Sequence, residues 1–225
     1  MLGRPLLLKQ LPSQLFSSMI KKTFLFVWLF LAGCNSIIPP TPTPQFTSPP
    51  ETIPITDESG ATVATQPGGL WVMVSGVDEH GLIIEHELVL FDEPDNEEAT
   101  TSLIHTGTAV VVHEIRQTGP QGLRRFYRVQ ALNGQMGWIS DYYVRRVVYL
   151  FDENGTAVSL FAAPDGQELT QVANVTPVII KEPTGADWWI VQTVEGDVLG
   201  WVQTGFIKES PEPEFLLNQQ HTHEP

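Results

Sequence analysis

The chain has 225 residues, which is enough for one medium-sized domain or two small ones, and a formal net charge of −14. A polypeptide beginning at Cys34 keeps eight of the twelve basic residues and all 26 acidic ones, which gives −18. Such an acidic chain excludes nucleic-acid binding by counterion release and would be repelled by anionic lipid head groups. Its 18 glycines and 18 prolines are typical of a turn-rich β protein with a proline-rich linker.

Residues 1–33 have the layout of a secretory signal. Lys21 and Lys22 precede an apolar run over residues 23–32, which is too short to span ~30 Å of hydrocarbon as a helix. The run ends in Leu31-Ala32-Gly33-Cys34, which resembles the lipobox of bacterial lipoproteins. The resemblance implies cleavage before Cys34 and acylation of its sulfur and its new amino terminus, with chains of the palmitate kind. Met19 is an alternative start for this signal peptide.

Cys34 is the only cysteine, so neither an intramolecular disulfide nor a cysteine metal cluster is possible. Acyl chains contribute about 0.8 kcal/mol per buried CH₂, and several of them anchor a protein firmly. We therefore expect a membrane-anchored protein on the extracytoplasmic face of the cell membrane. The outer membrane is the alternative, because Asn35 replaces the aspartate that the lipoprotein family uses as a retention signal. A buried core strand with a chance cysteine is the competing explanation.

Residues 34–67 are rich in proline and threonine, as in Pro39-Pro40-Thr41-Pro42-Thr43-Pro44. Proline lacks the N–H donor that helices and sheets require. We expect a disordered, mostly polyproline-II tether that extends ~3 Å per residue. The alternative is a ligand for a proline-reading groove.

A duplicated pattern occupies residues 68–209. Three segments recur in the same order: Leu90-Phe91 as Leu160-Phe161, residues 126–129 as 188–191, and residues 134–144 as 196–207. The offset falls from 70 to 62, and this period is too long for a solenoid repeat. The pattern predicts two small domains, 68–147 and 148–209, followed by a flexible tail, 210–225.

Each half consists of short apolar runs separated by Gly, Pro, Asn and Asp, which predicts short strands and turns. Six short strands in each half favour a small closed barrel, which leaves few open edges. The expected strands lie near residues 70–76, 82–90, 108–116, 124–132, 136–140 and 143–147, and then near 148–152, 157–161, 177–182, 187–194, 198–203 and 205–208.

The repeated pattern runs Leu-x-x-x-Pro, aromatic-aromatic-x-Val, Gly-x-x-Gly-Trp and a last aromatic-aliphatic pair. Over about 140 of the 225 residues it resembles the bacterial SH3-like domains of cell-envelope proteins. The resemblance implies an all-β chain with two small SH3-like barrels in tandem. It also implies a single 3₁₀ turn at residues 140–142 and at 203–205. Residues 71–80 have no counterpart in the family pattern, and Val175 stands where a turn glycine is usual.

Alternation along a strand assigns Tyr127, Val129, Trp189 and Val191 to the core and turns their neighbours outward. In SH3-like domains the ligand groove lies beside the 3₁₀ turn and is lined by aromatic residues. The candidate ligand-binding residues are therefore Phe126, Arg128, Trp138, Tyr142, Trp188 and Trp201. Packing between the two units or against the tether is the alternative for the outward apolar residues. A basic patch that meets acidic groups, or pairing with nearby acids, is expected for Arg116, Arg124, Arg125, Arg128, Arg145 and Arg146.

No catalytic motif is present: the sequence lacks Gly-x-Ser-x-Gly, His-Glu-x-x-His and a phosphate loop. We expect a non-catalytic binding module without metal or cofactor, held at the membrane through Cys34, that recognises peptidoglycan peptide or an envelope protein. A spacer or assembly scaffold is the alternative, with the two barrels packed on each other through Trp188 and Ile190. An unrecognised hydrolase is the remote alternative. The sequence does not indicate the oligomeric state.

Overall fold

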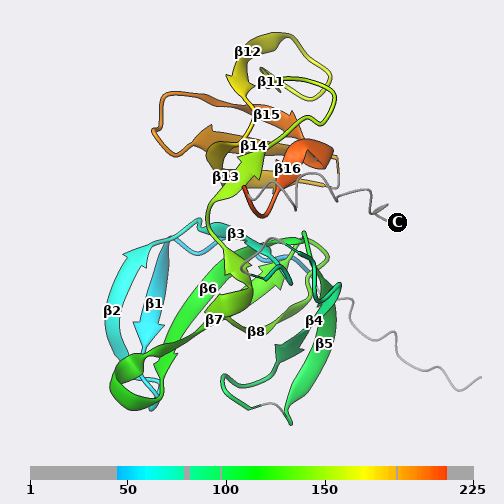
Figure 1. Ribbon diagram of the computed structural model, residues 1–225. Coiled ribbons are helices and arrows are strands. Elements are labelled where there is room, and N and C mark those ends of the chain that lie inside the picture. The colour runs from blue at the N-terminus through cyan, green and yellow to red at the C-terminus, as the bar shows by residue number, and fades with distance from the viewer. Residues whose placement is uncertain (1–44, 79–81, 97, 186, 212–225) are drawn as a thin grey trace, which may run out of the picture. The chain divides into compact units, whose positions relative to one another are not determined.

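Most of the described chain is organised into β-strands and the turns that join them. The computed structural model describes residues 45–78, 82–96, 98–185 and 187–211, and their strands form two sheets (Figure 1). The expected signal segment, Cys34 and most of the expected tail lie outside these residues. Within them, no helix has the length and apolar character that a membrane span requires. The all-β class expected from the sequence is confirmed.

The first sheet has nine strands and curls on itself (Figure 1). Its strands are β1 (Thr52–Thr56), β2 (Thr62–Pro67), β3 (Trp71–Val74), β4 (Glu87–Phe91), β5 (Thr100–His105), β6 (Ala109–Thr118), β7 (Arg124–Ala131), β8 (Met136–Ser140) and β9 (Val144–Arg145). Two 3₁₀ turns accompany them, η1 (Pro120–Gly122) and η2 (Asp141–Tyr143).

The second sheet has seven strands. They are β10 (Val148–Leu150), β11 (Ala157–Phe161), β12 (Glu168–Ala173), β13 (Thr176–Thr184), β14 (Trp188–Thr193), β15 (Leu199–Gln203) and β16 (Ile207–Lys208). A third 3₁₀ turn, η3 (Thr204–Phe206), joins the last two strands. The expected 3₁₀ turns are thus present in both halves, each displaced by one residue.

Strand order shows that the two sheets are copies of one pattern. The first sheet runs β5-β4-β8-β7-β6-β3-β9 and the second runs β12-β11-β15-β14-β13-β10-β16. The registers also correspond, because Phe91 pairs with Trp138 in the first sheet and Phe161 with Trp201 in the second. The β1–β2 hairpin is an addition to the first copy alone, where β1 runs parallel to the far part of β6.

The inward residues are those that alternation predicts. Tyr127 and Val129 belong to the core of the first sheet, and Trp189 and Val191 to that of the second. The apolar residues of the Gly-Trp stretch and its repeat are also buried, namely Ile139, Val144, Val202 and Ile207. The side chains at the alternate positions of these strands point away from the core, so each sheet has one packed face and one outward face.

Part of the first sheet is buried on both faces. On β3, Val72 and Val74 face the core of the first sheet, whereas Trp71 and Met73 join the core of the second. Ala109 and Val111 on β6 join that second core in the same way. This double burial explains the continuous apolar runs at residues 71–74 and 109–112, which do not alternate. Residues 71–74 belong to the segment 71–80, which has no counterpart in the family pattern. The double burial therefore gives part of that segment a packing role in both cores.

The sequence analysis was wrong about residues 52–67, which it assigned to an extended tether. They form the β1–β2 hairpin, and Ile53 is fully buried in the first core. Threonine and proline obscured the pattern, although threonine favours strands and proline is tolerated at a sheet edge. Burial of a single isoleucine, far from the rest of its core in sequence, is not visible as local periodicity.

Strands β5 and β12 were not expected from the sequence either. Each lies at the end of its sheet and pairs with one strand only. Ile104 is the one buried residue of β5, and no residue of β12 is buried. Such edge strands lack the apolar alternation on which a strand prediction depends.

The chain docks on the first sheet before β1 begins. The buried side chain of Gln130 accepts hydrogen bonds from the Thr47 backbone N–H at 3.2 Å and the Thr47 hydroxyl at 2.6 Å. It donates to the carbonyl oxygen of Gln45 at 3.0 Å. Next to these bonds, the Phe46 ring stacks on Trp71 with centroids 5.7 Å apart. Residues 45–47 therefore belong to the folded part of the chain.

Val175 occupies a left-handed turn, with φ of 66°, where the family pattern usually has glycine. The turn before the corresponding strand of the first sheet contains Gly107, with φ of 84°. This conformation is unfavourable for a β-branched residue. The Val175 side chain packs against the buried Val77, as do Ile83 and Phe151, and this contact offsets part of the cost.

Candidate ligand-binding site

An open pocket of about 460 Å³ lies beside the 3₁₀ turn of the first sheet. Its walls are Val77, Asp78, Asp141, Tyr142 and Arg145. This is the place at which the SH3-like resemblance implies a ligand groove. Tyr142, one of the candidates from the sequence, lines it with 56% of its surface exposed.

Short local contacts hold Tyr142 in this exposed position. The Ser140 hydroxyl accepts a hydrogen bond from the Tyr142 N–H at 3.3 Å and so caps the turn. Arg145 donates to the carbonyl oxygens of Tyr142 and Val77 and thereby ties the turn to the chain after β3. The Tyr142 ring meets Tyr143 edge to face, with centroids 5.1 Å apart. The aromatic surface is thus presented by a braced turn.

The pocket is acidic beside its aromatic surface. Asp78 and Asp141 contribute carboxylates, whereas Arg145 directs its hydrogen bonds to carbonyl oxygens of the wall. Burial raises the pKa of the neighbouring Tyr143 phenol, and Glu85 raises it further. Tyr143 therefore stays neutral near pH 7. An exposed aromatic ring in a pocket whose lining includes two aspartates suits a peptide that carries a positive charge.

Two of the expected candidates are not open, and this part of the prediction was wrong. Phe126 is 8% exposed and Trp138 is 5% exposed, although both lie on the outward face of the first sheet. The guanidinium of Arg116 covers the Trp138 ring at 4.8 Å from its centroid. The alternation of residues along the strands predicted the correct face for both side chains. It carries no information about whether a side chain distant in sequence covers them.

The other candidates lie on outward faces of the two sheets. Arg128 is exposed on the first, and Trp188 and Trp201 are half-buried on the second. Trp188 meets Phe161 edge to face, with centroids 5.4 Å apart. Neither Trp188 nor Ile190 belongs to the core that both sheets share, so the expected seam through these residues is wrong. The shared core instead uses Trp71, Met73, Ala109 and Val111.

The six arginines of the first half do not act as one basic patch, because four of them bind within the protein. Arg124 pairs with Asp95 at 2.7 Å, and Arg146 donates to the Tyr127 hydroxyl at 2.8 Å. Arg145 holds the wall of the Tyr142 pocket, and Arg116 pairs with Glu114 at 2.8 Å. Of the six, Arg125 and Arg128 are exposed, and within the described residues neither forms an ion pair.

A larger hollow of about 700 Å³ lies between the docked segment, Trp71 and the end of β13. Its aromatic wall is formed by Phe46 and Trp71, whose rings already stack on each other. The Tyr142 pocket is the stronger candidate because its aromatic ring is half-exposed. In the described part of the chain, no group of three or more His, Cys, Asp or Glu residues is placed to hold a metal ion.

Sequence reasoning did not select Asp78, Asp141 and Arg145 as pocket residues. Asp141 lies within the expected 3₁₀ turn and was available as a signal. Asp78 follows β3 in the segment without a family counterpart, so no spacing rule connects it with Tyr142. Only the tertiary structure brings these residues together.

No protein-family model and no curated protein matches the chain. Among solved structures, NlpC2 from Trichomonas vaginalis matches with 7% identity and a TM-score of 0.26, over 63% of this chain and 48% of that one. NlpC1 from the same organism matches with 9% identity and a TM-score of 0.25, over 63% of this chain and 46% of that one. This chain spans about half the length of either. At these TM-scores the likeness carries no argument about activity.

Proposed function

We propose that the protein is a lipid-anchored, extracytoplasmic, non-catalytic binding module. It consists of two SH3-like barrels that recognise cell-wall peptide or an envelope protein. The Tyr142 pocket is the observation that carries this proposal, since a braced and half-exposed aromatic residue stands at the 3₁₀ turn in a pocket that Asp78, Asp141 and Arg145 also line. The repeated strand order and the paired 3₁₀ turns support the assignment of both units to one SH3-like pattern.

Replacing Tyr142 by alanine should reduce retention of the full chain on isolated cell-wall material about tenfold. A central aromatic residue commonly carries a large share of the binding free energy, and its loss costs ~1–2 kcal/mol or more. The measurement is the bound fraction in a co-sedimentation assay. Leu199→Ala is the matched control, because Leu199 is an exposed apolar residue on the second sheet with 55% exposure. Equal losses in both variants would contradict the assignment of the site to Tyr142.

Retention of the unaltered chain also decides the ligand class. If the unaltered chain does not co-sediment with wall material, cell-wall peptide is ruled out and the envelope-protein form of the proposal is the one left to test. A crosslinker placed at position 142 would then identify the bound protein.

Replacing Cys34 by alanine should leave the chain unacylated and move it from the membrane fraction to the soluble fraction. The reason is the loss of all buried acyl CH₂ groups, at ~0.8 kcal/mol each. Fractionation with metabolic labelling by a fatty acid analogue measures both effects. If the Cys34→Ala variant stays in the membrane fraction and the unaltered chain takes up no fatty acid label, the lipobox interpretation is wrong.

A scaffold role is the second candidate function. It is supported by the core that the two sheets share, in which Trp71 and Met73 pack with residues of the second sheet such as Leu160 and Val202. Two units joined in this way would form a firm spacer. In that case both wall retention and crosslinking from position 142 would be absent, and the two experiments together separate the two functions.

A further inference from the structure

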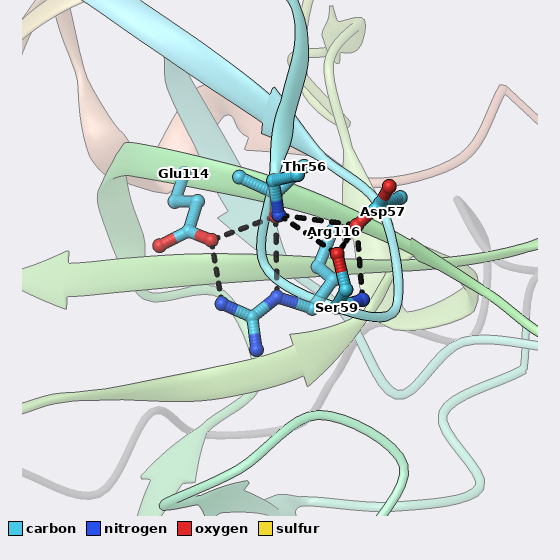
Figure 2. Close-up of polar contacts among 6 residues, drawn as sticks. Thr56, Asp57, Ser59, Glu114 and Arg116 are labelled. Carbon is cyan, nitrogen blue, oxygen red and sulfur yellow. Dashed lines mark hydrogen bonds and ion pairs between the residues drawn. The ribbon is translucent and has the colours of Figure 1, made fainter.

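The outward face of the first sheet contains a complete arginine site. The Arg116 guanidinium lies over the Trp138 ring, 4.8 Å from its centroid. It donates to a Glu114 carboxylate oxygen at 2.8 Å and to the Thr56 hydroxyl at 3.1 Å. Figure 2 shows Arg116 held by Glu114 and Thr56. An aromatic ring on one side and a carboxylate at the edge satisfy a planar cation well.

The second sheet repeats this face with the same register. Glu114, Arg128 and Trp138 form one cross-strand row, and the corresponding row is Glu182, Ile190 and Trp201. The next row is Arg116, Phe126 and Ser140 in the first sheet and Thr184, Trp188 and Gln203 in the second. A bulge precedes the glutamate in both sheets, after Val112 and after Ile180. Backbone positions are therefore equivalent, residue by residue.

The second copy keeps the ring and the carboxylate but lacks the cation. Threonine, Thr184, stands at the position of Arg116 and cannot reach over the ring. In the described part of the chain, no cation lies over Trp201 and Glu182 has no ion-pair partner. Glu182 is exposed and Trp201 is half-buried, whereas Glu114 and Trp138 are covered in the first copy. The β1 strand that supplies Thr56 also has no counterpart in the second sheet.

We propose that the outward face of the second sheet binds an arginine side chain of a partner protein. The guanidinium stacks on Trp201 and pairs with Glu182, as Arg116 does within the first sheet. Arginine fits better than lysine because its guanidinium is planar, stacks on aromatic faces and donates in a fork to one carboxylate. Phe161, Trp188 and Ile190 add an apolar surface for the residues that flank the arginine. The net negative charge of the chain favours a basic partner segment.

This site is on the second sheet and does not depend on the Tyr142 pocket. If binding at one of these two sites is disproved, the proposal for the other site is unaffected. A Tyr142→Ala variant that no longer binds wall material should still bind an arginine peptide with unchanged affinity, and loss of both activities in that variant would contradict the proposal of two separate sites.

The first test uses the full chain and three capped tripeptides: Gly-Arg-Gly, Gly-Lys-Gly and Gly-citrulline-Gly. Citrulline keeps the shape of arginine without its charge. The readout is the indole N–H signal of Trp201 in a ¹H–¹⁵N spectrum, assigned with Trp201→Phe. We expect a saturable shift with the arginine peptide, with about fivefold to tenfold weaker binding for lysine and none for citrulline. An equal response to citrulline, or no shift with arginine, would overturn the proposal.

The second test fills the site from within. Thr184→Arg should place a guanidinium over Trp201, shift the Trp201 signal in the free protein and abolish the response to the arginine peptide. Glu182→Gln should weaken peptide binding about fivefold by removing the charge partner. Val194→Arg is the matched control, because it adds the same charge at a 51% exposed position outside the site. If Thr184→Arg and Val194→Arg bind the peptide equally well, the site is not the one proposed.

Discussion

A Gly137→Ala variant should have a free energy of unfolding about 1–3 kcal/mol below that of the unaltered chain. A Cβ atom at this position would lie 2.7 Å from the Leu90 Cβ and 3.2 Å from the Phe91 carbonyl oxygen. Neither atom belongs to a flexible side-chain end, so the two strands must separate to admit a methyl group. This close approach is the physical reason for the glycine that precedes tryptophan in the repeated stretch.

The second copy provides a graded comparison. At Gly200 the added Cβ would lie 3.0 Å from the Leu160 Cβ, so Gly200→Ala should be destabilising in the same direction but by less. Gly205→Ala is the control, because nothing lies within 4 Å of its added Cβ. Urea and thermal unfolding followed by circular dichroism measure all three, and each kcal/mol corresponds to ~2–4 °C in Tm for a protein of this size. A Gly205 variant as unstable as Gly137→Ala would refute the close-contact explanation.

Replacing Trp71 by alanine should lower the free energy of unfolding by about 3–5 kcal/mol and should weaken the second sheet although Trp71 belongs to the first. Trp71 is 5% exposed and lies in the core that also contains Leu160, Val191 and Val202. Removal of the indole leaves a cavity in that shared core. The two sheets should consequently unfold in one cooperative transition.

Amide hydrogen exchange measures this coupling strand by strand. In Trp71→Ala, the amides of β14 and β15 should exchange faster together with those of β3 and β6. Trp188→Ala is the matched control, because Trp188 is half-buried on the outward face and lies outside the shared core. Unchanged protection of β14 and β15 in Trp71→Ala would show that the second sheet is stable by itself.

The shared core has a consequence for function. The Tyr142 pocket and the outward face around Trp201 are carried by units that share buried side chains. A core substitution in either sheet would thus reduce binding at both places through loss of folded protein. Binding measurements on the proposed sites therefore need variants whose unfolding midpoints are unchanged. Substitutions at Tyr142, Glu182 and Thr184 meet this condition best, because these residues are exposed.

The amino-acid sequence by itself determined the strands with alternating apolar residues and the duplicated register. These features depend on local periodicity and on turn residues that are close in sequence. The two 3₁₀ turns before the last strands were expected from the resemblance to SH3-like domains. It also determined that Tyr127, Val129, Trp189 and Val191 point inward, because side-chain direction follows from strand parity.

Only the tertiary structure decided which outward residues are open. Phe126 and Trp138 are buried, and Arg116, held by Thr56 from a hairpin assigned to the tether, covers the Trp138 ring. Trp201 stays half-exposed since its own sheet has neither that arginine nor that hairpin. The alternation of residues along a strand determines the face of the sheet on which a side chain lies. Whether that side chain is covered depends on contacts with residues distant in sequence, and no local sequence pattern indicates those contacts.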